Sequence, residues 1–430
     1  SSQCNACFVP ANKLIEKLGF EVIKISDYIG CQKNDTDFTA TTQPHSRAGF
    51  LRYQARGDFE KLVRESPDIY QHFVEASNIS ISAYLEIIKT EKPSCVLLHH
   101  GIYVPQGPAL EAAKITGTRS VTWSVMYRNR SVLLSCNDTY HKTLPRETKS
   151  DFDTEDWSDT DANRITSYLH SRTSGKNDWI SFSKMPDKPV DVREQFKISS
   201  DKEIYLLLTN VIWDANIHFS SDVFDDMIGW VTRTINLFEK MPDKHLFIRV
   251  HPAEVTGTIL SRQFVEEEIN TRFPTLPRNV HVIGPRDTEV DTYTLINSCD
   301  VATVYGSKAA IEVAARGKPV IITGAAWARG KGFTFDPIDQ THYEDLLSIK
   351  AERLALTTDQ KKLALKYAHY LFFERTIQIN SLIKPKYFGQ FVIDPSIDTI
   401  EKIEKDKNLQ TIISSLIENK SFVMKRVAHT

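Results

Sequence analysis

Three charged side chains spaced four residues apart lie in the segment VYGSKAAIEVAARGKPVI: they are Lys308, Glu312 and Arg316. This spacing puts all three on one face of a helix that would begin after a turn at Gly306 and Ser307. Free N–H groups at the helix start favour an anion such as a phosphate. The carboxylate of Glu312 would lie about 7–8 Å further along the axis, within reach of ribose hydroxyls. The alternative is an exposed ladder of ion pairs that only stabilises the helix.

The sequence RVHPAE places an imidazole where a predicted strand ends, because Pro252 cannot continue a β-ladder. His251 could donate a hydrogen bond there to a phosphate or a base, although a histidine at a strand end can also be structural. Arg249 lies two residues earlier, inside the apolar part of the strand. A buried arginine needs an anionic partner, which would be either a carboxylate of the protein or a ligand.

Two residues at other strand ends are candidates for the general base or nucleophile that a group transfer needs. Asp214 follows a predicted strand in NVIWDAN, beside Trp213, and His100 ends the strand of LLHHGIYVPQG. Each has a structural alternative, a turn aspartate beside a core tryptophan and a core histidine. Glu111 and Asp138 are weaker candidates.

The overall composition indicates a globular protein without a transmembrane segment, and it does not favour nucleic acid as the partner. The net charge of -2 over 430 residues is balanced, so nucleic acid is not the expected partner. No apolar run approaches the ~20 residues that cross a bilayer. The start of the sequence shows no signal peptide and the cysteines are scattered, so a cytoplasmic location is predicted.

No metal site is predicted. Cys4 and Cys7 form a single CxxC pair without a second pair, so the spacing does not predict a zinc site. Two Asp-x-Asp pairs, at 151–153 and 159–161, resemble a metal-binding motif but fall in a strongly acidic segment with no buried strand before it. They are interpreted as a solvated loop, and no cofactor is expected.

The second half of the chain alternates short apolar runs with helical patterns, which is typical of a doubly wound parallel sheet. Five strands are expected there, at 203–210, 244–252, 279–285, 300–306 and 318–324. Ligands bind such a sheet beyond the carboxyl ends of its strands, where Asp214, His251 and the turn of Gly306, Ser307 and Lys308 fall.

The first half is less regular but also predicts an α/β domain. Its expected strands cover 20–25, 94–100, 119–125 and 131–136. A linker with proline and lysine at 183–194 would separate the halves. Three parts are therefore expected: 1–190, 200–358, and a helical tail at 359–430. The tail helix around 409–417 is amphipathic, and either docks onto the protein or touches a membrane near Lys425 and Arg426.

The order of these motifs resembles a known family. HP at 251–252, GS at 306–307 followed by AAIEVAARGKPVI, and GKGFTFDP at 330–337 are similar to the second half of bacterial GT-B glycosyltransferases. The capsule polysaccharide biosynthesis group, which includes Kdo transferases, is the nearest resemblance, and it covers about 203–345. It implies two Rossmann-like domains that face a cleft, with C-terminal helices that cross back to the first domain.

The resemblance also implies roles for individual residues. His251 would contact the nucleotide or its phosphate, and Gly306, Ser307 and Lys308 would hold the phosphate. Glu312 would bind the ribose. Lys331, in the glycine-flanked RGKG loop with Arg329, would neutralise charge on the leaving group.

The predicted function is transfer of a sugar from a nucleotide donor to a surface polysaccharide or glycolipid, by an enzyme that needs no metal. CMP-Kdo or another CMP-activated acidic sugar is the first choice of donor, because the resemblance pairs HP with a serine motif. A UDP- or GDP-hexose donor is the alternative. A nucleotide-sugar 2-epimerase of the same architecture is the rival from another enzyme class, and peripheral contact with the inner membrane is left open.

Overall fold

A computed structural model describes most of the chain: residues 9, 12–13, 15–16, 19–30, 37–182, 190–214, 223–379, 383–385, 391–393, 401 and 404–424. Several predicted features lie outside these residues. They are the Cys4–Cys7 pair, positions 183–189 of the linker, and the basic pair Lys425–Arg426.

The second half of the chain forms a five-stranded parallel sheet in the order β6-β5-β4-β7-β8. The strands are β4 (Glu203–Leu208), β5 (Lys244–Arg249), β6 (Val280–Ile283), β7 (Val301–Val304) and β8 (Val320–Ile322). Their apolar side chains are buried on both faces, as near-continuous apolar runs require. All five predicted strands are present, and each is shorter than its apolar run because the polar strand ends leave the sheet.

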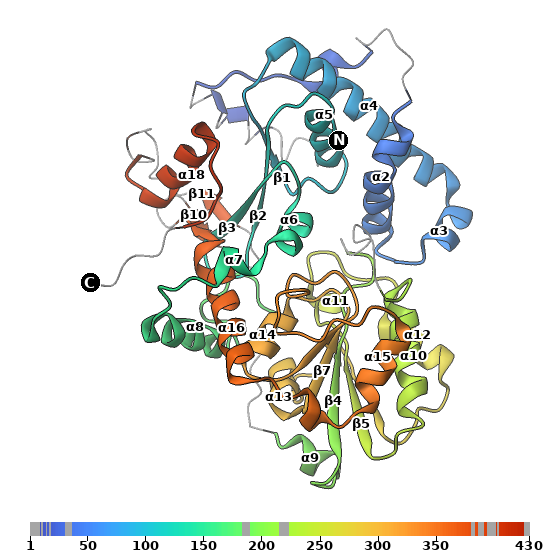
Figure 1. Cartoon of the computed structure of the whole chain (residues 1–430). Coiled ribbons are helices and arrows are strands. Elements are labelled where there is room, and N and C mark those ends of the chain that lie inside the picture. The colour runs from blue at the N-terminus through green and yellow to red at the C-terminus, as the bar shows by residue number, and fades with distance from the viewer. Residues whose placement is uncertain are drawn as a thin grey trace.

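Helices cover this sheet and connect its strands. They are α9 (Val192–Gln195), α10 (Met227–Phe238), α11 (Ala253–Thr256), α12 (Val265–Arg272), α13 (Thr292–Ser298), α14 (Ala309–Ala315) and α15 (Gln340–Ser348), with the 3-10 turn η3 (Ala351–Leu354). Figure 1 shows α13 and α14 on one side of the sheet and α10, α12 and α15 on the other. Asp226 and Asp291 begin α10 and α13 by accepting hydrogen bonds from backbone N–H groups.

The first half forms a smaller sheet in the order β1-β2-β3-β9. Strand β1 (Val96–His99) runs parallel to β2 (Ser120–Val125), whereas β3 (Ser131–Cys136) runs antiparallel to β2. The remaining elements are η1 (Ile25–Tyr28), α2 (Thr39–Gln54), α3 (Phe59–Glu65), α4 (Pro67–Glu91), α5 (Gln106–Ile115), α6 (Tyr140–Arg146), α7 (Lys149–Phe152) and α8 (Asp159–Ser171). The predicted strand at 20–25 is wrong: residues 20–24 are irregular and η1 begins at Ile25.

The C-terminal part returns to the first domain, as predicted. It comprises α16 (Thr358–His369), the π-helical turn η4 (Tyr370–Glu374), β9 (Ile377–Gln378), β10 (Ile383–Pro385), β11 (Phe391–Ile393) and α18 (Lys407–Ile417). Figure 1 shows α16 rising from the lower domain toward the upper one. There β9 pairs with β3, and Ile412 of α18 is buried in the same apolar cluster as Val121 and Ile377. Docking of the tail helix onto the protein is therefore what the structure shows.

One apolar cluster contains residues of both domains. Phe152 and Ile165 from the first half pack in the same cluster as Leu206, Val304 and Tyr367. A second contact joins α2 and α3 to Val211 and Trp213 at the end of β4. The halves are thus joined on two sides of the space between them, which fixes the walls of any cavity there.

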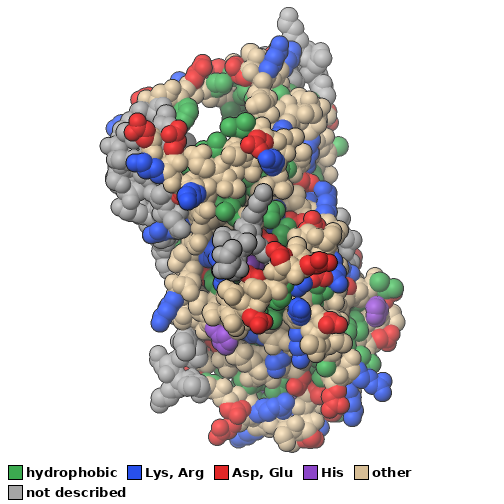
Figure 2. All heavy atoms as spheres, turned by 60° about the vertical axis from the view of Figure 1, so that its left-hand side comes forward, with side chains coloured by type: hydrophobic (Ala, Val, Ile, Leu, Met, Phe, Trp, Pro, Cys, Tyr) green, Lys and Arg blue, Asp and Glu red, His purple; other side chains and the backbone are tan. Residues whose placement is uncertain are grey.

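Lysines, arginines and acids are intermixed over the face drawn in Figure 2. This mixture agrees with the balanced net charge. No helix among the described residues is long and apolar enough to span a bilayer.

Candidate functional site

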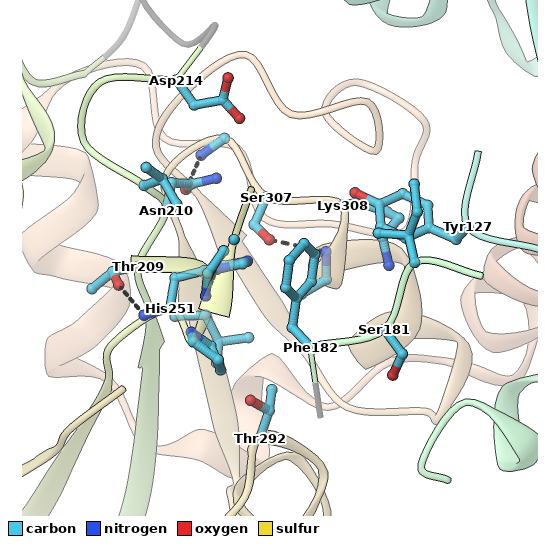
Figure 3. Close-up of a pocket in the computed structure, with 18 of the residues that line it drawn as sticks. Tyr127, Ser181, Phe182, Thr209, Asn210, Asp214, His251, Thr292, Ser307 and Lys308 are labelled. Carbon is cyan, nitrogen blue, oxygen red and sulfur yellow. Dashed lines mark hydrogen bonds between the residues drawn. The ribbon is translucent and has the colours of Figure 1, made fainter. Parts of the chain in front are cut away.

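A cavity of about 450 Å³ lies between the two domains, and its wall comes from both. The first domain contributes Arg52, the turns after β1 and β2, and Phe182. The second domain contributes the carboxyl ends of β4, β5 and β7 together with the start of α14. Figure 3 shows side chains from these segments around one space. This is the position that the strand-end rule predicts for a ligand in an open α/β sheet.

Three adjacent strands deliver polar groups to this cavity. Beyond β4, Thr209 Oγ1 accepts a hydrogen bond from the N–H of His251 at 3.0 Å. Asn210 Oδ1 accepts from the N–H of Gly306 at 3.3 Å. The Oγ of Ser307 accepts from the N–H of Ala309 at 3.1 Å, at the start of α14. The predicted residues His251, Gly306 and Ser307 are therefore held together by the ends of β4, β5 and β7.

The ring of His251 is fixed in one tautomer by its own backbone. Its Nδ1 accepts a hydrogen bond from the N–H of Ala253 at 3.1 Å, so in the neutral ring the proton is on Nε2. Burial lowers the pKa of His251; the charge of Asp214 opposes that shift, the charges of Arg249 and Lys308 add to it, and the net pKa is about 4. At neutral pH the ring is thus an uncharged donor. Phe182 packs edge-on against it at 5.2 Å between centroids, and both side chains line the cavity.

Both candidates for the general base reach the cavity, from opposite sides. Asp214 follows β4, and its Oδ1 accepts a hydrogen bond from the Tyr103 hydroxyl of the first domain at 3.2 Å. His100 follows β1 with a left-handed backbone, φ 64°, and burial lowers its pKa to about 4, while Asp214 opposes that shift. The Asp214 carboxylate and the neutral His100 ring are therefore close enough for the charge of one to change the pKa of the other, and the Tyr103 hydroxyl contacts Asp214.

The two weaker candidates lie away from the residues that line the cavity. Glu111 pairs with Lys114 at 2.9 Å and approaches His45 at 3.5 Å. Asp138 is close to Lys114 and Arg146, at 3.7 and 3.5 Å. Both carboxylates serve ion pairs around α5 and α6.

The predicted ribose contact of Glu312 does not fit the structure. This side chain is 2% exposed, and its Oε2 accepts hydrogen bonds from Arg172 Nε at 2.9 Å and from the Tyr293 hydroxyl at 2.8 Å. Its Oε1 is bound by the ammonium of Lys308. Protein donors therefore take both oxygens, although Glu312 borders the cavity. Neither an exposed ladder nor a free ribose ligand describes it.

The structure gives Lys331 backbone partners in place of the predicted phosphate. This ammonium is buried, and it donates to the carbonyls of Leu144 and Pro145 at 3.2 and 3.0 Å and to that of Glu147. It closes the C-terminal end of α6 and so joins the two domains. Arg329 likewise binds backbone carbonyls, those of Ile322 and Pro337 at 2.8 and 2.7 Å.

Arg249 lines the cavity, but backbone carbonyls satisfy most of its donors. It donates to the carbonyl of Asp287 at 3.1 Å, to the carbonyl of Gly284, and to Thr292 Oγ1 at 3.4 Å. Burial lowers its pKa, and the carboxylates of Asp287 and Asp291 oppose that shift. Its contact with a ligand stays a prediction.

A buried acid lies directly behind the HP motif. Glu254 is 0% exposed, and its Oε1 accepts a long hydrogen bond of 3.4 Å from the N–H of Val265. Its Oε2 has no hydrogen-bond partner among the described residues. Burial raises the pKa of Glu254 to about 8, and the charges of Glu266 and Glu267 add to the shift. The carboxyl is thus mostly protonated at neutral pH.

Several wall residues carried no sequence signal, since each is an ordinary residue of a helix or turn. Arg172 follows α8 and reaches Glu312 across 140 positions of sequence. Tyr127 lies under the Lys308 ammonium at 4.0 Å from its ring centroid. Arg52 stacks on Tyr103 at 4.7 Å. Their importance comes from tertiary contacts that no local pattern encodes.

No group of three potential metal ligands occurs in the part of the chain that the structure describes. The two Asp-x-Asp pairs belong to helix ends instead of a solvated loop: Asp151, Asp159 and Asp161 lie in first turns, and Asp153 follows α7. Asp151 completes the capping box of α7 and Asp161 that of α8. Asp153 accepts a hydrogen bond from Lys366 of α16.

A comparison with protein families matches residues 162–370 to the model described as capsule polysaccharide biosynthesis protein. This span contains HP, GSxxxxE and GKP, so it confirms the resemblance that these motifs predicted. A search of the curated proteins finds no match.

Solved structures with a related arrangement are distant in sequence. KpsC of Thermosulfurimonas dismutans, a β-Kdo 2,4 transferase, is 17% identical over 74% of this chain and 92% of that chain, with a TM-score of 0.42. The β-Kdo 2,7 transferase structure of the same KpsC is 12% identical over 77% and 89%, with a TM-score of 0.40. A putative UDP-N-acetylglucosamine 2-epimerase from Listeria monocytogenes is 13% identical over 90% and 97%, with a TM-score of 0.33. These likenesses are too remote to assign a donor or an acceptor.

Proposed function

We propose that this protein transfers a sugar from a nucleotide donor to a growing capsule polysaccharide or its glycolipid anchor. The glycosyltransferase class follows the match of residues 162–370 to the capsule polysaccharide biosynthesis model. A CMP-activated acidic sugar such as Kdo is the proposed donor, on the pairing of HP with a serine motif. The cavity between the domains is the proposed site of transfer.

The second domain would hold the donor. The Nε2–H of His251 is an uncharged donor whose orientation is fixed by Ala253, so it is suited to meet a phosphate oxygen. Lys308 supplies positive charge on the same wall, and Ser307 with Gly306 offers small polar groups between them. Such fixed donors stabilise the charge that develops on the leaving phosphate.

The first domain would present the acceptor hydroxyl to the donor. Asp214 lies at the boundary between the domains and is exposed, so it is the proposed base that removes the hydroxyl proton. The acceptor oxygen then bonds to the anomeric carbon while the bond from that carbon to the phosphate oxygen breaks. The neutral His100 ring lines the cavity from the first domain, and its interaction with the charge of Asp214 makes it the group that could share the proton.

The observation that carries this proposal is the fixed tautomer of His251 at a cavity built from three strand ends. We expect CMP to raise the melting temperature of the wild-type protein, and His251→Gln to reduce that shift by weakening CMP binding about tenfold, since one hydrogen bond to a charged group is lost. Differential scanning fluorimetry with CMP, UDP and GDP measures this.

His245→Gln is the matched control. His245 is another half-buried histidine of this sheet, but it lies at the start of β5, at the end opposite to His251, where it stacks on His281 of β6. A shift with UDP or GDP alone would replace the donor and keep the enzyme class. Absence of any shift in the wild-type protein would refute nucleotide binding at this cavity.

A further inference from the structure

We infer that Arg172 and Glu312 are positioning residues that hold the ammonium of Lys308 at the cavity wall, where it meets the phosphate of the donor. This inference rests on the proposed function and assigns Glu312 a role other than ribose binding. It also brings in Arg172, a residue outside the second domain, as a determinant of donor binding.

The first step is that protein groups donate hydrogen bonds to both carboxylate oxygens of Glu312. Arg172 Nε, the Tyr293 hydroxyl and Lys308 all donate to this buried carboxylate. Burial alone would raise the pKa of Glu312, but the charges of Arg172, Lys308 and Arg316 outweigh burial and hold the pKa well below its usual range. Glu312 is therefore a permanent anion that orients the cations around it.

The second step is the immobility of Arg172. Its Nη1 donates to Tyr168 Oη at 3.1 Å and to Asp178 Oδ2. The Tyr168 hydroxyl in turn donates to Asp178 Oδ1 at 2.6 Å. Hydrogen bonds from Nη1 to Asp178 and Tyr168 therefore fix the guanidinium of Arg172, while its Nε donates to Glu312. Breaking either contact would leave a buried charge without its partner.

The third step is the position of Lys308. Its side chain is 11% exposed and borders the cavity, with the Tyr127 ring beneath the ammonium at 4.0 Å. An ammonium has three N–H donors. Glu312 binds it from one side, the Tyr127 ring covers another, and the Phe372 ring centroid lies 5.9 Å away. We infer that the donors left over are the ones that meet a ligand in the cavity. Figure 3 shows Lys308 and Tyr127 together at one end of this space.

The pairing of charges in this cluster bears on which cation a phosphate would bind. Two cations, Arg172 and Lys308, face two anions, Asp178 and Glu312. Arg172 is bound to both anions through its Nε and Nη1, whereas Lys308 has a single carboxylate partner among the described residues. We therefore assign the phosphate contact to Lys308, and Arg172 holds Glu312 in place beside it.

The charge state of Lys308 gives a readout that a purely structural role would not change. Burial and the charge of Arg172 lower the pKa of Lys308, the carboxylates of Glu312 and Asp178 raise it, and the net result is a pKa of about 8. The other titratable groups that face it are Tyr127, beneath the ammonium, and His251, whose ring is neutral. Phosphate binding should therefore weaken as the pH rises through about 8 and the ammonium loses its proton.

The experiment is isothermal titration of CMP, UDP and GDP between pH 7 and pH 10, on the folded full chain. For the wild-type protein we expect the affinity for nucleotide to fall at alkaline pH. For Lys308→Met we expect an affinity at pH 7 that is at least tenfold below that of the wild-type protein, with no further fall at alkaline pH. For Arg172→Met we expect lower affinity at pH 7 and an alkaline fall that moves to higher pH, because a repelling charge near Lys308 is gone.

Arg172→Lys keeps the charge but loses the Nε contact, so it should weaken binding while the alkaline fall stays near pH 8. It also serves if Arg172→Met does not fold. Arg193→Met is the control, because Arg193 binds the carbonyls of Ser199 and Lys202 and is absent from the cavity wall. Unchanged affinity and pH profile in Lys308→Met or in both Arg172 variants would overturn the inference. A wild-type protein that binds none of the three nucleotides would instead reject the proposed function, and this inference with it.

Discussion

Replacing Asp214 by Asn is expected to lower the rate of sugar transfer by about 10²–10⁴-fold, the usual contribution of a general base. The amide keeps the size of the side chain and can still meet the Tyr103 hydroxyl, which now contacts Asp214 Oδ1 at 3.2 Å. It cannot take a proton from the acceptor. Binding of the donor nucleotide should change less than threefold, because the proposed phosphate contacts are His251 and Lys308.

The measurement is release of free nucleotide from the donor in the presence of a glycolipid acceptor, alongside a binding titration of the same variant. Asp287→Asn is the control: Asp287 belongs to the second domain, and its Oδ1 accepts from the N–H groups of Glu289 and Val290. If Asp214→Asn kept wild-type transfer, His100 would become the candidate for the base. Loss of both transfer and nucleotide binding would assign Asp214 to donor binding.

Replacing Glu254 by Gln is expected to remove a large part of the pH dependence of stability. In the folded protein burial raises the pKa of Glu254 to about 8 from its usual 4.5. Between these values the folded state holds a proton that the unfolded state has lost. Stability from this group is thus complete below about pH 4.5 and declines by up to about 1.4 kcal/mol per pH unit until about pH 8.

Urea unfolding at pH 5.5 and pH 7.5 measures the effect. Relative to the wild-type protein, Glu254→Gln should gain about 2–3 kcal/mol on going from the lower to the higher pH, since Gln has no proton to lose. Glu289→Gln, at an exposed position of the same domain, should show no such gain. Parallel pH profiles for wild type and Glu254→Gln would mean that the carboxyl is ionised in the folded protein.

The sequence was informative wherever local pattern and function coincide. All five strands of the second domain were predicted, because buried parallel strands are continuous apolar runs. The cavity position followed from the strand-end rule, which correctly grouped Asp214, His251 and Ser307. The strand predicted at 20–25 failed, since an apolar run alone does not say whether a partner strand is available to pair with it.

Side-chain roles were less predictable than positions. The spacing of Lys308, Glu312 and Arg316 correctly placed them on one helix, but burial of Glu312 depends on Arg172 and Tyr293, which come from other segments. Lys331 was expected to neutralise charge on the leaving group from a glycine-flanked loop, yet it donates to carbonyls at the end of α6. Such contacts are set by how the domains pack, which a local pattern cannot show.

A crystal structure of the protein with the nucleotide that gives the largest thermal shift tests the central claim most directly. The account predicts that the phosphate lies within hydrogen-bond distance of both His251 Nε2 and the Lys308 ammonium, with Ser307 beside it. A phosphate bound elsewhere, for instance in the neighbouring hollow beside Arg286 and Asp287, would contradict it.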